Sequence, residues 1–355
     1  MLLNRENMMR KRIAILSLCC LMTVSGCGLF QEDSGAYDAG IAAMEQKDYP
    51  TALGEFQKAA NDDDREAESY RQEGIVYYKM QDYEHAIALL EKSLSAMKFK
   101  KASFSRDIYF YLGEIYQIQG EDDKALEIYD KLIAEDKDAT ASFLRGKLYL
   151  NQHEDEKATA DFEKSLEADP AFDNYIQIYL AYAQLNRSAD GAAYLEEVVK
   201  QTPESPEEEY NQGRAYYYLE SYDKAREVLI QADNDGADES AILLGKIYMD
   251  TGDTANARAV YQNLLQEEEE DAAAYNGLAL CDMSEENYDS ALANIQEGLK
   301  ADEGSQEEAL LFNEIIVYER KLDFAAAKTK MAEFLTKYPD NQDAIRENTF
   351  LQSRE

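Results

Sequence analysis

The chain has 355 residues and a formal net charge of −36, because 72 Asp and Glu residues outnumber 36 Lys and Arg residues. A surface this acidic repels phosphate backbones and anionic lipid headgroups, which excludes a general role in nucleic-acid binding. The simplest interpretation of the acidity is a solvated surface, and the alternative is attraction of a basic partner or of loosely held cations.

The N-terminal segment is typical of a bacterial export signal. Residues 10–12 are basic, and the apolar run 13–24 is too short to span a bilayer as an ordinary helix but has the length of a signal core. Small residues then precede Cys27, which resembles the lipobox of bacterial lipoproteins. We therefore expect a lipoprotein signal peptide at residues 1–26 and lipidation at Cys27; an ordinary signal peptide with a chance cysteine is the alternative.

The predicted cleavage fixes the location and the cysteine chemistry of the mature chain. Residues 27–33 would be a short tether to the outer side of the bacterial membrane, and a diacylated Cys27 supplies the two acyl chains that stable anchoring requires. Cys19 and Cys20 would be lost with the signal, so Cys281 would be the one free thiol. No internal disulfide is then expected, and Cys281 is predicted to be a small core residue.

A short pattern recurs along the rest of the chain, in which a polar or acidic turn is followed by an alanine. The intervals between successive alanines are 32 to 39 residues, which indicates a stacked array of repeats. The alanines are Ala52, Ala86, Ala125, Ala158, Ala193, Ala225, Ala257, Ala291 and Ala327.

Other residue types keep the same register. Twelve residues before the alanine stands a small residue in every unit except the last, which has Ile315. A tyrosine commonly follows three residues later, and a large apolar residue stands four residues after most of the alanines. These spacings predict two antiparallel helices that approach closely at the small residues. No single hairpin buries its apolar face, so neighbouring hairpins must stack.

These columns resemble the tetratricopeptide repeat, with a small residue at consensus position 8, an aromatic at 11, Ala at 20, a large apolar residue at 24 and Pro at 32. The resemblance covers residues 34–339. It implies an all-α, right-handed superhelical solenoid of about nine helical hairpins. Unit five departs from it, with Gln184 and Glu197 at positions 11 and 24, and unit nine has Ile315 at position 8. Residues 340–355 are predicted to form a C-terminal capping helix.

The longest interval, between Ala86 and Ala125, contains a basic insertion at residues 98–106. Its simplest interpretation is a longer loop between repeats that offsets the surrounding acidity. A contact for an anionic group is the alternative.

Residue types that carry catalysis are scarce. The two histidines, His85 and His153, lie in turn segments without Cys or His at ligand spacing, and we expect both to be exposed. The acidic stretch 233–236 fails as a calcium loop because its Gly comes fourth rather than sixth. The sequence therefore predicts no enzyme, no metal site and no cofactor.

The resemblance implies that positions 2, 5, 9 and 12 of each first helix line a concave groove. On this chain positions 5, 9 and 12 are largely apolar and aromatic, with Lys147, Arg214 and Lys246 at position 9. We expect an extended or helical peptide to bind there, with these three cations holding an acidic side chain or a carboxylate. The alternative is that these positions pack on neighbouring helices, or that a terminal segment of the chain itself occupies the groove. The candidate partner-binding residues are Tyr78, Phe110, Phe143, Lys147, Tyr182, Tyr210, Arg214, Tyr217, Lys246 and Met249.

The predicted function is that of a membrane-anchored scaffold or adaptor that binds a protein or peptide partner in the bacterial cell envelope. The membrane would be contacted through the lipid anchor only. A glycan- or peptidoglycan-binding module is the alternative, because aromatic grooves also stack on sugars, although the chain has no Trp.

Overall fold

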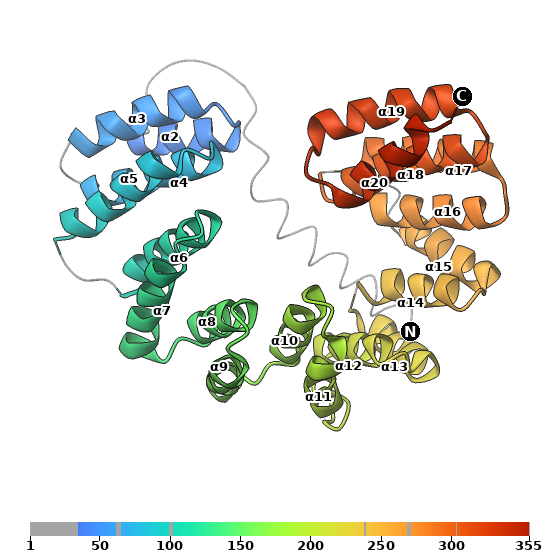
Figure 1. The fold of residues 1–355 in the computed structure, drawn as a ribbon, viewed down its shortest axis with the longest axis horizontal. Helices are drawn as coiled ribbons and strands as arrows, with labels where there is room; N and C mark the ends of the chain where they lie inside the picture. The colour runs from blue at the N-terminus through green and yellow to red at the C-terminus, as the bar shows by residue number, and fades with distance from the viewer. Residues whose placement is uncertain are drawn as a thin grey trace, which may run out of the picture. The chain divides into compact units, whose positions relative to one another are not determined.

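The computed structural model describes residues 35–61, 65–98, 102–237, 239–267, 271–302 and 304–354. In these ranges the regular structure consists of nineteen helices without a strand, which confirms the all-α prediction (Figure 1). The predicted signal peptide, Cys27 and the tether lie outside the described residues, as do residues 99–101 of the basic insertion. No helix of the described part is long and apolar enough to cross a membrane.

The helices alternate along the chain between first and second members of hairpins. The first helices are α2 (Ala36–Glu45), α4 (Glu66–Lys79), α6 (Ala102–Ile118), α8 (Ala139–Asn151), α10 (Phe172–Gln184), α12 (Pro206–Tyr218), α14 (Glu239–Asp250), α16 (Ala272–Ser284) and α18 (Glu307–Arg320). The second helices are α3 (Tyr49–Asn61), α5 (Tyr83–Ala96), α7 (Asp122–Asp136), α9 (Asp155–Ala168), α11 (Ser188–Val198), α13 (Tyr222–Asp235), α15 (Thr254–Glu267), α17 (Tyr288–Ala301) and α19 (Phe324–Lys337). The last helix is α20 (Gln342–Gln352).

The chain divides into two compact units, of which unit 1 ends at Gly120 and unit 2 begins at Glu121. Unit 1 contains the hairpins α2–α3 and α4–α5 together with α6. Unit 2 begins with α7 and continues through the five hairpins from α8–α9 to α16–α17, the last hairpin α18–α19, and α20. In unit 2, α8 and α10 line the inner side of its curve, and α9 and α11 lie on the outer side (Figure 1).

Close packing within a hairpin follows the predicted pairing of a small residue with a large one. Leu229 on α13 lies directly on Gly213 of α12, where an added Cβ would come within 2.5 Å of the Leu229 side chain. Phe162 lies on Gly146 in the same way, and both large residues have no exposed surface. The two helices can therefore approach closely only because position 8 lacks a side chain.

The turns share one backbone geometry that the sequence pattern did not indicate. Two residues before each second helix begins, each repeat has a residue with a left-handed backbone, and only two of these nine residues are glycine. In the turn before α5, the N–H of Asp82 donates to the carbonyl of Tyr77 at 2.9 Å, which satisfies a carbonyl at the end of α4. The Asp82 side chain then accepts from the His85 N–H and caps α5. The left-handed residues are Lys47, Gln81, Gly120, His153, Asn186, Glu220, Gly252, Glu286 and Leu322.

The register predicted for unit five was wrong by two residues. Every second helix from α3 to α19 begins three residues before its position-20 residue, and α11 begins at Ser188, which places Gly191 at that position. Gly191 is buried whereas Ala193 is exposed. Leu195, with no exposed surface, then takes position 24 instead of Glu197. The two registers differ because the recurring pattern follows alanine, whereas the residue that packs at position 20 of this unit is a glycine.

The C-terminal segment forms a final helix, α20, against the last hairpin. Asn341 caps it by accepting from the Ala344 N–H at 2.8 Å. Ala344 and Leu351 are fully buried in a cluster with Phe334, while Phe350 on the opposite side is 39% exposed. The prediction of a capping helix is therefore confirmed over Gln342–Gln352.

A pair of carboxyl groups joins this cap to the last hairpin. Burial, followed by the facing carboxyl of Glu347 on α20, raises the pKa of Glu319 on α18 to about 7. Between pH 4.5 and 7, folded Glu319 keeps a proton that the unfolded chain has released, so the free energy of unfolding falls as the pH rises through this window. We expect Glu319→Gln to stabilise the chain by about 1–2 kcal/mol at pH 8, a value discounted for partial exposure, and to have little effect at pH 4.

Urea unfolding followed by circular dichroism at pH 4 and pH 8 measures this difference. Glu227→Gln is the matched control, because Glu227 is an exposed acid on α13. It removes the same charge from an exposed position. An equal gain from both variants at pH 8 would mean that general charge repulsion, and not the pair with Glu347, governs the pH dependence.

Candidate partner-binding face

The site predicted in unit 2 lies on three first helices. We call these residues the first-helix face: Phe143 and Lys147 on α8, Tyr210, Arg214 and Tyr217 on α12, and Lys246 and Met249 on α14. All are partly exposed, and Lys246 is the most open of them. The inner position of α8 in Figure 1 agrees with the concave side that the resemblance implies.

Helix α12 supplies the aromatic part of the first-helix face. Ser205 caps α12 and Pro206 opens it, so that Tyr210, Arg214 and Tyr217 follow at i, i+4 and i+7 on one side. The two tyrosines pack against a buried cluster that includes Leu229. Their rings are thus held in place while part of each remains open to solvent, which suits a rigid contact surface.

Arg214 already has a carboxylate partner within the chain. Its Nη1 donates to Oδ1 of Asp173 on α10 at 2.6 Å and to Oδ1 of Asn211 at 2.7 Å. The guanidinium also lies over the Tyr210 ring, 5.6 Å from its centroid. Arg214 therefore ties two neighbouring hairpins together, and an acidic ligand would have to compete with Asp173.

Lys246 is also paired. Its Nζ lies 3.0 Å from Oδ2 of Asp250, and the Tyr217 hydroxyl donates to the same oxygen at 3.0 Å. Partial burial opposes the charge of Lys246, but the hydrogen bonds with Tyr217 and Asp250 raise its pKa overall. The ammonium also lies 5.4 Å from the Tyr217 ring centroid. Of the three cations predicted to hold an acidic group, only Lys147 has no hydrogen-bond or ion-pair partner among the described residues.

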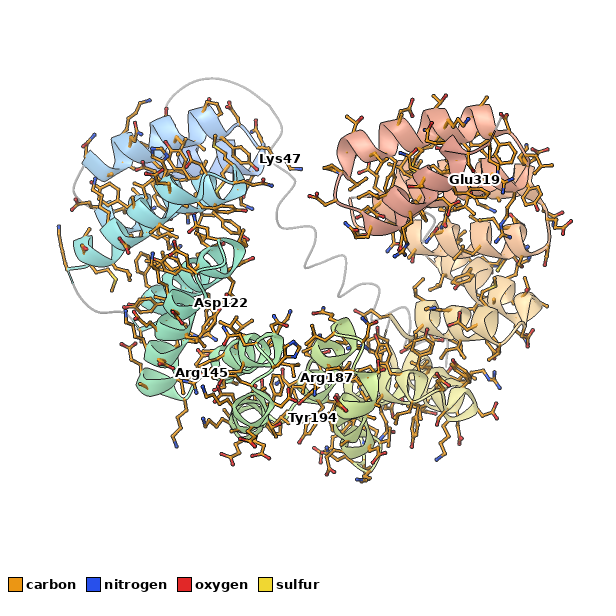
Figure 2. All side chains as sticks on the ribbon, in the orientation of Figure 1. Lys47, Asp122, Arg145, Arg187, Tyr194 and Glu319 are labelled. Atoms are coloured by element: carbon orange, nitrogen blue, oxygen red, sulfur yellow. The ribbon has the colours of Figure 1, made fainter. Side chains whose placement is uncertain are left out.

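Tyr182 does not lie on the first-helix face. It is 5% exposed, and its ring packs near Phe162 and Tyr194 at centroid distances of 6.0 and 6.2 Å; Tyr194 is labelled in Figure 2. The corrected register explains this difference, because Tyr182 takes the buried position 11 of unit five, where Gln184 was expected. The structure therefore places Tyr182 in the core and not on the groove-facing position where it was expected.

The two remaining candidates, Tyr78 and Phe110, belong to unit 1. The Tyr78 hydroxyl donates to Glu114 at 2.7 Å, and burial followed by this carboxylate raises the pKa of Tyr78 to about 12. Phe110 is half-buried, and the Arg106 guanidinium lies 4.7 Å from its ring centroid. Both residues thus have local partners within unit 1, as Arg214 and Lys246 have in unit 2.

The sequence pattern was not used to predict the acids that lie along the first-helix face. Asp173 stands at position 2 of the corrected unit five, a position that the resemblance places in the groove, but the predicted site used positions 5, 9 and 12 only. Glu207 and Glu239 occupy the same position on α12 and α14. Aligned repeats could therefore have shown this row of acids.

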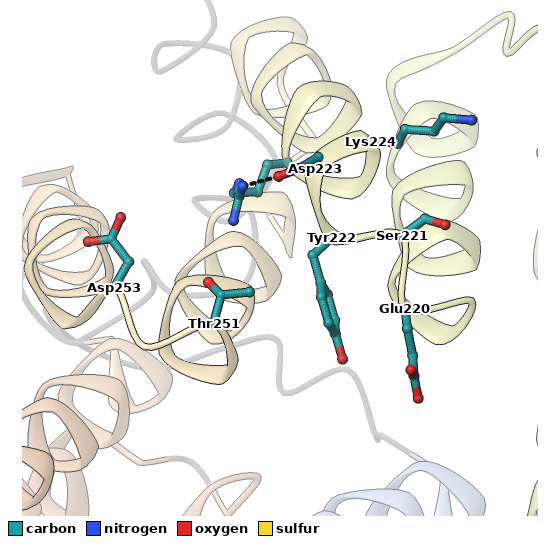
Figure 3. A pocket seen from close by; sticks show the side chains of 8 residues that line it. Glu220, Ser221, Tyr222, Asp223, Lys224, Thr251 and Asp253 are labelled. Atoms are coloured by element: carbon teal, nitrogen blue, oxygen red, sulfur yellow. Dashed lines mark hydrogen bonds and ion pairs between the residues drawn. The ribbon is translucent and has the colours of Figure 1, made fainter.

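A pocket of about 570 Å³ opens elsewhere, at the hairpin turns of units six and seven (Figure 3). None of the predicted partner-binding residues lines it. Asp223 and Arg226 form an ion pair in it, and the lining contains no histidine or cysteine to act as a base or nucleophile. The lining residues are Glu220, Ser221, Tyr222, Asp223, Lys224, Arg226, Thr251 and Asp253.

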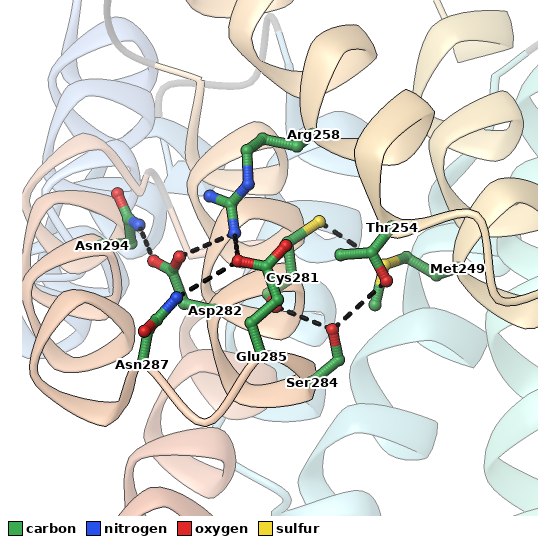
Figure 4. Close-up of polar contacts among 9 residues, drawn as sticks. All are labelled: Met249, Thr254, Arg258, Cys281, Asp282, Ser284, Glu285, Asn287 and Asn294. Atoms are coloured by element: carbon green, nitrogen blue, oxygen red, sulfur yellow. Dashed lines mark hydrogen bonds and ion pairs between the residues drawn. The ribbon is translucent and has the colours of Figure 1, made fainter.

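Figure 4 shows a polar cluster that is structural. Nη2 of Arg258 on α15 donates to Asp282 at 2.8 Å and to Glu285 at 2.9 Å. Asp282 stands where the other repeats commonly have tyrosine, and it is 4% exposed. The neighbouring Cys281 is fully buried, as predicted, and burial raises the pKa of its thiol to about 11. Such a thiol is a core residue and not an activated nucleophile.

The remaining chemistry-bearing side chains do not form a metal centre. In the described ranges, no three His, Cys, Asp or Glu side chains converge as metal ligands would. Both histidines are exposed, as the sequence predicts; His153 lies in a turn, whereas His85 belongs to the first turn of α5.

Comparison with known proteins identifies the repeat. One model of the tetratricopeptide repeat matches residues 71–140, 179–239 and 242–307, and a second matches residues 139–172. Yeast Tom70 is similar in structure, with 17% sequence identity over 85% of this chain and 67% of that one and a TM-score of 0.54. A tetratricopeptide repeat protein from Parabacteroides merdae has 17% identity over 71% of this chain and 98% of its own, with a TM-score of 0.45. Comparison with curated protein sequences gives no match.

Proposed function

Because the chain belongs to the tetratricopeptide repeat family, we propose that it is a non-catalytic scaffold whose first-helix face binds a protein partner. The observation that carries this proposal is the row of partly exposed, packed aromatic residues on α8 and α12, in a protein whose surface is otherwise strongly acidic. Rigid aromatic rings give contact area at low entropic cost, and they are common among residues that dominate binding energy.

Capture of partners by the full chain tests the role of this face. We expect a protein retained by the wild-type chain to be lost on Tyr210→Ser/Tyr217→Ser. The control is Ile230→Ser/Leu322→Ser, which removes apolar side chains that are 44% and 73% exposed and lie outside the first-helix face. Equal retention by the two double variants would contradict the proposal, and retention of cell-wall glycan alone would favour the alternative of a glycan-binding module.

The proposed location is the bacterial cell envelope, with the chain anchored through diacylated Cys27. The support is the sequence pattern of residues 10–27, a basic start, an apolar core and small residues before the cysteine. Metabolic labelling with an alkyne fatty acid is expected to mark the wild-type chain in the membrane fraction and to leave Cys27→Ser unlabelled. Equal labelling of both chains would rule out Cys27 as the lipid attachment site.

A further inference from the structure

Two of the three cations of the first-helix face, Arg214 and Lys246, are already paired with acids of this chain, while Lys147 has no such partner among the described residues. Arg214 donates to Asp173 at 2.6 Å, and Lys246 lies 3.0 Å from Asp250. An acidic group on a ligand would have to displace one of these carboxylates and would add to the repulsion from a chain of net charge −36. These contacts weigh against the expectation that the face holds an acidic peptide.

In contrast to these paired cations, two acids on α12 and α14 have no cation partner among the described residues. Glu207 and Glu239 lie in the first turns of α12 and α14, at the repeat position that Asp173 occupies on α10. Both are exposed, and neither has a cation partner among the described residues. Acids in a first turn also stabilise the helix, so this row by itself does not indicate a ligand.

The acids of this row lie near the Tyr210 ring: Glu207 stands three residues before Tyr210 on α12, so the two side chains are neighbours on that helix. Burial raises the pKa of Tyr210, and Glu239 and Asp173 are among the charges that raise it further. Glu239 on α14 is therefore within electrostatic reach of the ring on α12. On α12 and α14 the face thus combines packed apolar surface, the paired cations Arg214 and Lys246, and the unpaired acids Glu207 and Glu239.

We infer that the partner segment bound here is a cationic amphipathic peptide, with apolar side chains on Tyr210, Tyr217 and Met249 and Lys or Arg side chains against Glu207 and Glu239. This inference rests on the proposed function, because it specifies the partner of the same face. Charge complementarity of this kind steers association and selects among partners. Binding should therefore weaken as salt is raised.

A random dodecapeptide display library, selected on the full chain, provides the probe. We expect the enriched peptides to be rich in Lys or Arg and in Leu or Phe. The strongest peptide is then synthesised, and its Kd is measured by fluorescence anisotropy on the wild-type chain and on three double variants. Glu207→Gln/Glu239→Gln should weaken binding about three- to tenfold, as expected for the loss of two exposed ion pairs.

Two matched variants separate the possible results. Glu196→Gln/Glu227→Gln removes two exposed acids from the second helices α11 and α13, with the same change in net charge, and should leave the Kd within about twofold of wild type. Tyr210→Ser/Tyr217→Ser should abolish binding. Enriched peptides that are neutral or acidic, but still need the tyrosines, would overturn the inference and leave the proposed function standing. If no enriched peptide depends on the tyrosines, both the inference and the proposed function are contradicted. If the two glutamine double variants weaken binding equally, only the inference is contradicted.

Discussion

Replacing Arg145 by alanine is expected to destabilise unit 2 by about 3 kcal/mol, the lower end of the cost of breaking a buried ion pair, because buried Asp161 would keep only its second partner, Lys164 at 2.7 Å. Arg145 on α8 (Figure 2) donates from Nε and Nη2 to the two oxygens of Asp161 on α9, at 2.6 and 2.7 Å. It also pairs with Asp130 on α7. Asp161 is 2% exposed, so that water cannot replace the guanidinium.

The effect is measured by urea unfolding of the full chain, followed by circular dichroism. Lys200→Ala is the control, because Lys200 and Glu197 form an exposed pair on the surface, for which we expect a loss below about 0.5 kcal/mol. The double variant Arg145→Met/Asp161→Leu should recover most of the stability, since an apolar pair leaves no buried charge. A loss from Arg145→Ala as small as that from Lys200→Ala would contradict the prediction.

The hairpins could be predicted because their determinants are local and repeat. A small residue on one helix and a large one on the next stand sixteen residues apart in every well-formed unit, and the structure brings Gly213 onto Leu229 as this spacing requires. The same spacing holds for the ion pair of Arg145 with Asp161. It recurs with the charges exchanged in Glu314 and Lys330, whose Oε2 and Nζ are 3.2 Å apart. Comparing repeats position by position would have found both pairs.

Contacts between hairpins could not be predicted in the same way. Arg214 and Asp173 are 41 residues apart, and their pairing depends on side-chain conformations that no periodic pattern records. In unit five, Gly191 and Ala193 are both small and stand two residues apart. The choice between them decides whether Tyr182 lies on the surface or in the core, and only the packing of α11 resolves it.

Replacing Gly277 by alanine is expected to destabilise unit 2 by about 2–3 kcal/mol, at the upper end of the range for an overpacked core. The Tyr261 ring on α15 is held between Gly245 of α14 and Gly277 of α16. A Cβ at Gly277 would lie 2.4 Å from Cζ of Tyr261, and one at Gly245 would lie 2.5 Å from the same atom. The ring therefore cannot move away from one helix without colliding with the other. This cost exceeds the gain of about 1 kcal/mol from alanine's helix propensity.

A second substitution distinguishes this collision from a general effect of altering a helix. In the presence of Tyr261→Leu, which removes the ring, Gly277→Ala should cost less than about 1 kcal/mol, giving a clear coupling energy in a double-mutant cycle of urea unfolding. Gly54→Ala on α3 is the matched control, because no atom lies within 4 Å of its added Cβ. It should raise stability by up to about 1 kcal/mol, since alanine is the better helix former. If Gly277→Ala also raised stability, the Tyr261 ring would have room to move. The packing of α14, α15 and α16 around this ring would then not require glycine at positions 245 and 277.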